Sequence, residues 1–252
     1  MENQDQARLP FRILPQPDEV TCGPTCLEAL YHYYGEDLPL ERVIAEVPML
    51  EGGGTLAVLL ACHALRRGYR ATLFTYKLQL FDPTWLTGEK VDLAAKLRAQ
   101  LAHKNEAKLR VASEGFLEFL ALGGEVRCED LTGALIRRYL NRGIPILAGL
   151  SATWLYRSPR EYGPNSDYDD VRGEPSGHFV VLRGYDRGAR TVAVADPLRS
   201  NPLTQTQKYE AGMDRVINAI LLGVLTYDAN LLIVRPRAER RRHGASSADR
   251  GG

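Results

Sequence analysis

The sequence predicts an α+β fold in which helices come first along the chain and a mostly antiparallel sheet follows. Apolar residues recur at helical spacing over residues 22–34 and 56–67, in the first half of the chain. The second half carries two strand-like runs, 178–185 and 191–196, that a short turn of Asp, Arg, Gly and Ala separates. A turn this short makes the two runs antiparallel neighbours.

The remaining elements follow from the same patterns. Pro24 suits the first turn of the first helix, and Gly35 suits the stop after its end. We expect further helices at 90–122 (broken near Asn105), 131–141 and 213–222, and further strands at 69–76, 144–150 and 230–234.

These elements predict one domain over residues 11–235, with a helical insertion at about 77–125. Residues 1–10 are expected to form a flexible arm. Residues 157–177 are expected to form a long loop, of a kind that is often functional. The segment 236–252, rich in arginine, is expected to be a disordered basic tail.

Composition restricts the class of protein. Of the 252 residues, 44% are hydrophobic and 25% charged, which is typical of a soluble globular chain with a real core. The net charge of +1 gives no body-wide basic field, so neither a nucleic acid nor a membrane is expected as a partner. No apolar run of 18 residues and no signal-peptide pattern occur, which predicts a cytoplasmic protein with reduced thiols.

Cys22 stands where a loop enters the first helix. The N–H groups and dipole of a helix N-terminus stabilise a thiolate, the form that attacks a carbonyl. The alternative, a small buried hydrophobic residue, carries equal weight for Cys22 taken alone. Cys26, one helical turn further on, is expected to be structural.

The hairpin supplies a histidine and a carboxylate. If its loop is residues 186–188, His178 lies directly opposite Asp196, at about 5 Å between Cβ atoms. Asp196 can then hold one imidazole nitrogen and leave the other free for a nucleophile. A purely structural His–Asp pair is the alternative.

Gln16 precedes Cys22 by six residues. With the Cys22 backbone N–H, its side-chain amide can form an oxyanion hole. A surface glutamine in a loop flanked by prolines is the alternative.

Three strings in this chain resemble C39-like cysteine peptidases, members of the papain-like superfamily. The first is QPDEVTCGPTCLEALYHYYG at residues 16–35. The others are GHFVVLRGYD at 177–186 and VADP at 194–197. The chain is most similar to the stand-alone form of these peptidases, without transporter domains.

This resemblance implies a papain-like fold and hydrolysis of a peptide or isopeptide bond, with no metal or organic cofactor. It assigns Cys22 as nucleophile, His178 as general base, Asp196 as orienter and Gln16 as oxyanion donor. The substrate is expected to be a flexible segment of a cytoplasmic protein or peptide. An ATP-grasp peptide ligase is implied as a partner, because some stand-alone C39-like proteins accompany such ligases.

Other readings remain open at this point. The same triad can serve a transpeptidase or acyltransferase, and a C39-like fold can bind peptides without cutting them. A thioredoxin-like motif is disfavoured because three residues, not two, separate Cys22 from Cys26. Zinc binding is disfavoured because Cys128 stands alone. The charge of the substrate stays undecided, because Arg183 and the acidic run at 167–170 argue in opposite directions.

Overall fold

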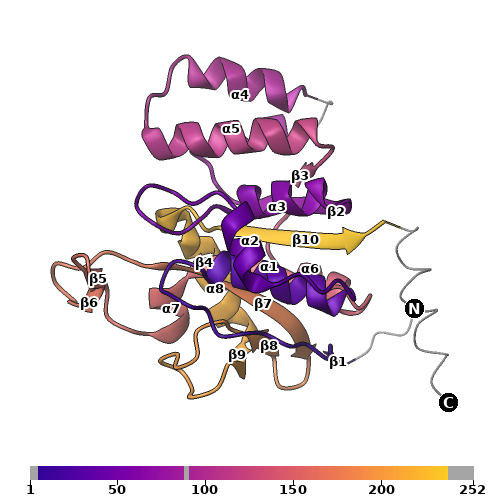
Figure 1. Cartoon of the computed structure of the whole chain (residues 1–252), viewed down its shortest axis with the longest axis vertical. Coiled ribbons are helices and arrows are strands. Elements are labelled where there is room, and N and C mark those ends of the chain that lie inside the picture. The colour runs from indigo at the N-terminus through magenta and orange to yellow at the C-terminus, as the bar shows by residue number, and fades with distance from the viewer. Residues whose placement is uncertain (1–4, 88–90, 238–252) are drawn as a thin grey trace.

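The computed structural model describes residues 5–87 and 91–237 (Figure 1). Its centre is an eight-stranded sheet with the order β3-β2-β10-β4-β7-β8-β9, and β1 pairs with β7 at one end of that strand. Within the described residues β2 and β3 pair in parallel, and the other pairs of the sheet are antiparallel. The predicted α+β class with a mostly antiparallel sheet is confirmed.

The strands of this sheet are β1 (Gln6–Arg8), β2 (Tyr69–Thr75), β3 (Glu125–Arg127), β4 (Ile146–Ser151), β7 (Gly177–Asp186), β8 (Thr191–Ala195), β9 (Lys208–Gly212) and β10 (Asn230–Pro236). A separate two-stranded ribbon consists of β5 (Glu161–Tyr162) and β6 (Asp167–Tyr168). The helices are α1 (Cys22–Tyr33), α2 (Leu40–Glu46), α3 (Ala57–Arg66), α4 (Leu93–Leu101), α5 (Ala107–Ala121), α6 (Gly133–Leu140), α7 (Ala152–Tyr156) and α8 (Met213–Leu222), with 3-10 turns η1 (Pro83–Trp85) and η2 (Gly223–Thr226).

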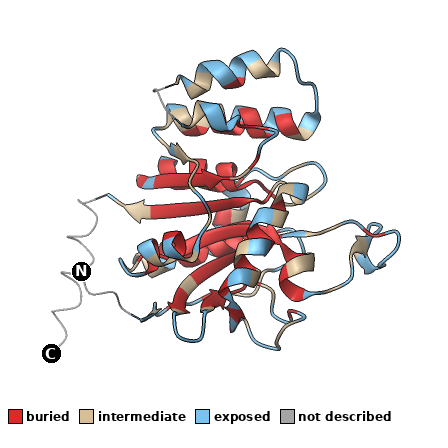
Figure 2. Cartoon of the chain, turned by 180° about the vertical axis from the view of Figure 1, so that it is seen from behind, coloured by how far each residue is buried: buried red, intermediate tan, exposed pale blue. Residues whose placement is uncertain are grey.

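Helices cover both faces of the sheet, so its central strands are apolar throughout. On β7, Val181 belongs to the core shared with α1 and α3, whereas Val180 and Leu182 belong to the core shared with α6 and α8. This alternation follows from the two-residue period of a strand. Figure 2 shows the resulting band of buried strands, with exposed residues on the outer helices.

The helical insertion packs on the outer side of α3 and forms one end of the molecule (Figure 1). Contact is close at Gly115 of α5, where a Cβ atom would lie 2.9 Å from a methyl group of Val58. Within the insertion, Phe116 packs edge-on against Phe81, with ring centroids 4.8 Å apart. The two helices α4 and α5 occur where the sequence predicted a broken pair.

Several expectations need correction. Residues 6–8 form β1, so the N-terminal arm is a paired strand there and not a loose segment. The loop at 157–177 contains the ribbon of β5 and β6. The sequence patterns missed α2, α7, β3 and β9. Most of the predicted basic tail, 238–252, lies outside the described residues.

The helices in the described part of the chain were also compared with the length of a membrane span. None of them is both long and apolar enough to cross a bilayer.

Candidate active site

Cys22 is the first residue of α1. Thr21 precedes the helix, and its carbonyl accepts both the backbone N–H of Thr25, at 3.0 Å, and the Thr25 hydroxyl, at 2.8 Å. These bonds fix the first turn. Cys22 is 8% exposed and lines a cleft of about 390 Å³. The thiol therefore lies at a positive helix end and still faces solvent.

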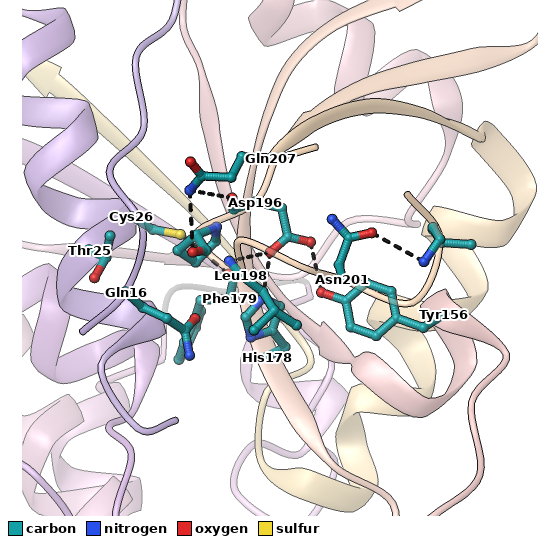
Figure 3. Close-up of polar contacts among 12 residues, drawn as sticks. Gln16, Thr25, Cys26, Tyr156, His178, Phe179, Asp196, Leu198, Asn201 and Gln207 are labelled. Carbon is teal, nitrogen blue, oxygen red and sulfur yellow. Dashed lines mark hydrogen bonds and ion pairs between the residues drawn. The ribbon is translucent and has the colours of Figure 1, made fainter. Parts of the chain in front are cut away.

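His178 lines the same cleft, one residue into β7. Its Nε2 lies 2.9 Å from Oδ1 of Asp196, which is fully buried (Figure 3). Cys22 lies close enough to the same imidazole to favour its charged form. Since Asp196 occupies Nε2, Nδ1 is the nitrogen left for the thiol. The structure thus brings the three predicted residues together.

The predicted hairpin register is wrong, although the pair it predicted forms. Leu182 pairs with Val194, and a bulge at Arg183 shifts the register before Gly184 pairs with Ala193. The turn has four residues, 187–190, because Asp186 pairs with Thr191. Asp196 is therefore not directly opposite His178. It lies just past the end of β8, where its side chain reaches back to the imidazole.

The charges of this pair stabilise each other. Burial disfavours the imidazolium, but the charge and hydrogen bond of Asp196, together with Cys22, outweigh it and raise the pKa of His178 to about 10. Burial also favours a neutral Asp196. The imidazolium of His178 and several hydrogen bonds outweigh that effect and hold the pKa of Asp196 below its ordinary value.

Two tyrosines complete the surroundings of Asp196. The hydroxyl of Tyr156 donates to Oδ2 of Asp196 at 2.7 Å, and the backbone N–H of Leu198 donates to Oδ1 at 2.9 Å (Figure 3). The hydroxyl of Tyr209 also donates to Oδ2, at 2.7 Å. The sequence patterns singled out neither tyrosine as a site residue, and they missed the strand that carries Tyr209. No local motif marks either residue, because their contacts join segments 13 to 40 positions apart in the chain.

Gln16 lies beside the turn that follows Asp196. Its backbone N–H donates to the carbonyl of Pro197 at 3.0 Å. Its side-chain amide, however, donates to the carbonyl of Asp18 at 2.7 Å, and its buried Oε1 has no hydrogen-bond partner among the described residues. In this arrangement the amide does not line the cleft, so an oxyanion role requires it to leave Asp18.

The cleft carries more carboxylates than cations. It is lined by Glu19, Glu174 and Asp228, and by Lys108 of the inserted helix α5. Burial raises the pKa of Asp228 to about 7, against the opposing effects of Thr226, Lys108 and the neighbouring Lys77. Arg183, which the sequence suggested as a substrate cation, does not line this cleft.

Of the four cysteines, which are all free thiols, Cys26, Cys62 and Cys128 do not line the cleft. Cys26 is fully buried with Sγ 3.3 Å from the carbonyl of Phe179, and burial raises its pKa well above the usual value. Burial also raises the pKa of Cys62, to about 12. In the part of the chain that the structure describes, no group of three or more Cys, His, Asp or Glu side chains is placed to bind a metal.

The fold brings the candidate residues together from a helix and a sheet. A helix that begins at a cysteine packs on a mostly antiparallel sheet, and the histidine on that sheet bonds to the aspartate. The predicted arrangement, with the Cys22 helix packed on such a sheet, is confirmed.

Comparison with protein families gives a match over part of the chain. Residues 123–219 match the model of the Peptidase_C39 like family, a segment that contains His178 and Asp196 but not Cys22. The resemblance to C39-like peptidases predicted from the sequence is therefore confirmed. A comparison with curated proteins finds no match.

Solved structures with a similar chain path include three peptidases. One is a C39-like peptidase from Bacillus anthracis, with a TM-score of 0.47, 14% identity and coverage of 93% of this chain and 99% of that one. Another is a double glycine motif protease from an AMS/PCAT transporter, in complex with the leader peptide, with a TM-score of 0.44, 14% identity and coverage of 92% and 95%. The third is xylellain from Xylella fastidiosa, with a TM-score of 0.43, 12% identity and coverage of 93% and 87%.

Proposed function

We propose that this chain is a cysteine peptidase that hydrolyses a peptide or isopeptide bond. One observation carries the proposal: Cys22 and His178 line a single cleft, and the buried Asp196 holds the far nitrogen of that imidazole. A purely structural His–Asp pair has no need of a thiol at a helix N-terminus in the same cleft. The three side chains together form a nucleophile, a base and an orienter.

The chemistry follows from these positions. The Cys22 thiolate attacks the carbonyl carbon of the scissile amide, and the imidazolium of His178 donates its proton to the leaving amine. The resulting thioester is then attacked by a water molecule, from which His178 removes a proton. Hydrolysis of the thioester releases the acid and restores the thiolate of Cys22 beside the imidazolium of His178.

Charge on the tetrahedral intermediate needs hydrogen-bond donors. The backbone N–H of Cys22 is one donor, and we propose the Gln16 amide as the second. Gln16 supports this role through its backbone bond to Pro197, which ties its loop to the Asp196 turn. Its side chain must exchange the carbonyl of Asp18 for the substrate oxygen.

The substrate is proposed to be a flexible, extended segment of a cytoplasmic protein or peptide. An open cleft between a helix and a sheet accepts main chain more readily than a folded surface. The excess of carboxylates over Lys108 favours segments with basic residues. The ATP-grasp ligase partner implied by the family resemblance stays a prediction.

The deciding experiment is incubation of the full chain with a mixed peptide library, followed by mass spectrometry of the products. Hydrolysis that is lost in Cys22→Ala is the expected result. Products joined to added amines, in place of free acids, would indicate an acyltransferase. Peptides that bind both forms with no turnover would indicate a binding module and overturn the proposal.

A further inference from the structure

The carboxylate of Asp196 is saturated with hydrogen bonds. An ionised carboxylate has about four acceptor positions. His178 and the N–H of Leu198 occupy two of them on Oδ1, at 2.9 Å each. The hydroxyls of Tyr156 and Tyr209 occupy the two on Oδ2, at 2.7 Å each. A fully buried group therefore has a partner for every lone pair.

We propose that Tyr156 and Tyr209 are positioning residues of this active site. Together they keep the Asp196 carboxylate ionised and fixed in one orientation, so that it holds His178 towards Cys22. The inference rests on the proposed function for its catalytic meaning. The contacts that carry it are independent of any substrate.

Two independent parts of the chain supply these hydroxyls. Tyr156 is the last residue of α7, whereas Tyr209 is on β9, the edge strand beyond β8. Both side chains are 7% exposed. The Tyr156 ring also lies against the imidazole of His178, with centroids 6.0 Å apart and planes tilted by 53°. Asp196 is therefore held from a helix on one side and a strand on the other.

The electrostatic reason is the cost of burying an ionised carboxylate. Such a charge is stable in a protein interior only when donors replace the lost water. Distances of 2.7 Å are typical of strong, charge-assisted O–H···O bonds. Burial and the neighbouring charge of Asp196 raise the pKa of both Tyr156 and Tyr209, so each hydroxyl keeps its proton and stays a donor.

The geometric reason is the freedom of the carboxylate to rotate. With one oxygen unpartnered, the group could turn about its Cβ–Cγ bond and carry the imidazole with it. Two hydroxyls on Oδ2 and the Leu198 N–H on Oδ1 fix its plane. The remaining acceptor position on Oδ1 then points at Nε2 of His178. This bond keeps the proton on Nε2 and leaves Nδ1 of the imidazole directed towards the thiol of Cys22.

The test uses Tyr156→Phe, Tyr209→Phe and the double variant in the full chain. Each change removes a hydroxyl and keeps the ring. Tyr185→Phe is the matched control, because Tyr185 is buried on the same strand as His178 and its hydroxyl donates to Asn141. Two readouts need no substrate: the imidazole N–H proton resonance of His178, and the rate of Cys22 alkylation by iodoacetamide as a function of pH.

Each single variant is expected to lower the alkylation rate about tenfold, because a hydrogen bond to a charged group is lost. The double variant is expected to lose more. The acid limb of the rate profile should move to higher pH, since the pKa of Asp196 rises when donors are removed. The resonance of His178 should shift in these variants and stay in place in Tyr185→Phe.

An unchanged resonance and an unchanged pH profile in the single variants would overturn the inference, whether or not the double variant folds. Equal shifts in Tyr185→Phe would overturn it as well, because they would indicate a general loosening of the sheet. Failure of the proposed function can be distinguished from failure of this inference. If only the proposed function is wrong, the resonance and the pH profile still shift in the tyrosine variants, but the unmodified protein cleaves no peptide.

Discussion

Two buried aspartates flank His178 and titrate in opposite directions. Asp196 has its pKa held below the ordinary value, whereas burial raises the pKa of Asp228 to about 7. Both are more than nine-tenths buried. Burial therefore does not decide the charge of either residue. Hydrogen-bond donors decide it, because four of them converge on Asp196.

Asp228 has weaker support. Thr226 and the charges of Lys108, Lys77 and His178 favour its ionised form, but burial outweighs them. Burial lowers the pKa of Lys77 itself to about 7, and its Nζ has no hydrogen-bond partner among the described residues. In the proposed mechanism Asp196 stays ionised and orients His178. Asp228 lines the cleft, and its pKa of about 7 means that its charge changes near neutral pH.

The largest effect is expected from Asp196→Asn compared with Asp228→Asn. The first change leaves the shape of the site intact but removes the charge that compensates the imidazolium and selects its tautomer. Turnover should fall roughly hundredfold or more. Steady-state rates on a cleaved peptide measure it, with circular dichroism to confirm folding.

Asp228→Asn is the matched control for that experiment. It removes an equally buried carboxylate that does not contact the imidazole nitrogen, so the rate at neutral pH should change only a few-fold. Comparable losses in both variants would contradict the division of roles between the two aspartates.

Asp228 should make the protein less stable as the pH rises. A carboxyl whose pKa is raised on folding destabilises the fold progressively as the pH rises from about 4 to about 7. Asp228→Asn should therefore increase the free energy of unfolding by about 1 kcal/mol or more at pH 8, and change it little at pH 4. Urea denaturation at the two pH values measures the difference.

At His178 stability also falls as the pH rises, but at higher pH and through loss of a stabilising charge. Its pKa is raised on folding, so its stabilisation is complete below about pH 6.5 and is lost as the pH rises through about 10. In His178→Gln the loss of stability should be largest at pH 6 and should shrink towards pH 10. A loss that does not vary with pH would mean that the imidazolium pair contributes nothing.

Gly177→Ala tests how tightly Asp228 is held against the catalytic strand. A methyl group there would overlap Oδ2 of Asp228 and approach the Thr226 hydroxyl to 2.8 Å. We expect a loss of about 1–3 kcal/mol of stability, typical of overpacking. Gly212→Ala is the control, since no atom lies within 4 Å of its added methyl group. Equal thermal midpoints for the two variants would show that Asp228 can move aside freely.

The smallest effect is expected at the rim of the cleft. Replacing Glu19 and Glu174 by Gln together should lower kcat/KM about threefold for a peptide with lysine near the scissile bond. The same pair of changes should leave a neutral peptide unaffected. The difference should shrink in high salt, because exposed charges are screened. A loss that is independent of salt would point to contact rather than charge.

Much of the site could be predicted from the sequence because its signals are local. A cysteine at a loop-to-helix junction predicted the position of Cys22. A short turn between two apolar runs predicted that His178 and Asp196 would meet. The positions of the histidine at the start of the first run and the aspartate at the end of the second were enough to predict this pair, even though the predicted register was wrong.

What could not be predicted depends on irregular or distant contacts. The bulge at Arg183 and the four-residue turn have no distinctive sequence pattern, so the register that places Asp196 just past the end of β8 could not be derived. Tyr209 is on a short strand whose alternating pattern was not recognised. Asp228 reaches the cleft from a segment 50 residues after His178, a juxtaposition that only the folded sheet creates.

The most direct test of the whole account is the alkylation of the four cysteines by iodoacetamide at pH 7, with each site mapped by mass spectrometry. Cys22 should react much faster than Cys26, Cys62 or Cys128, and Asp196→Asn should slow Cys22 alone. Burial raises the pKa of Cys26 and Cys62, so both should be nearly inert. Equal labelling of all four, or a Cys22 rate that is indifferent to Asp196, would contradict the account.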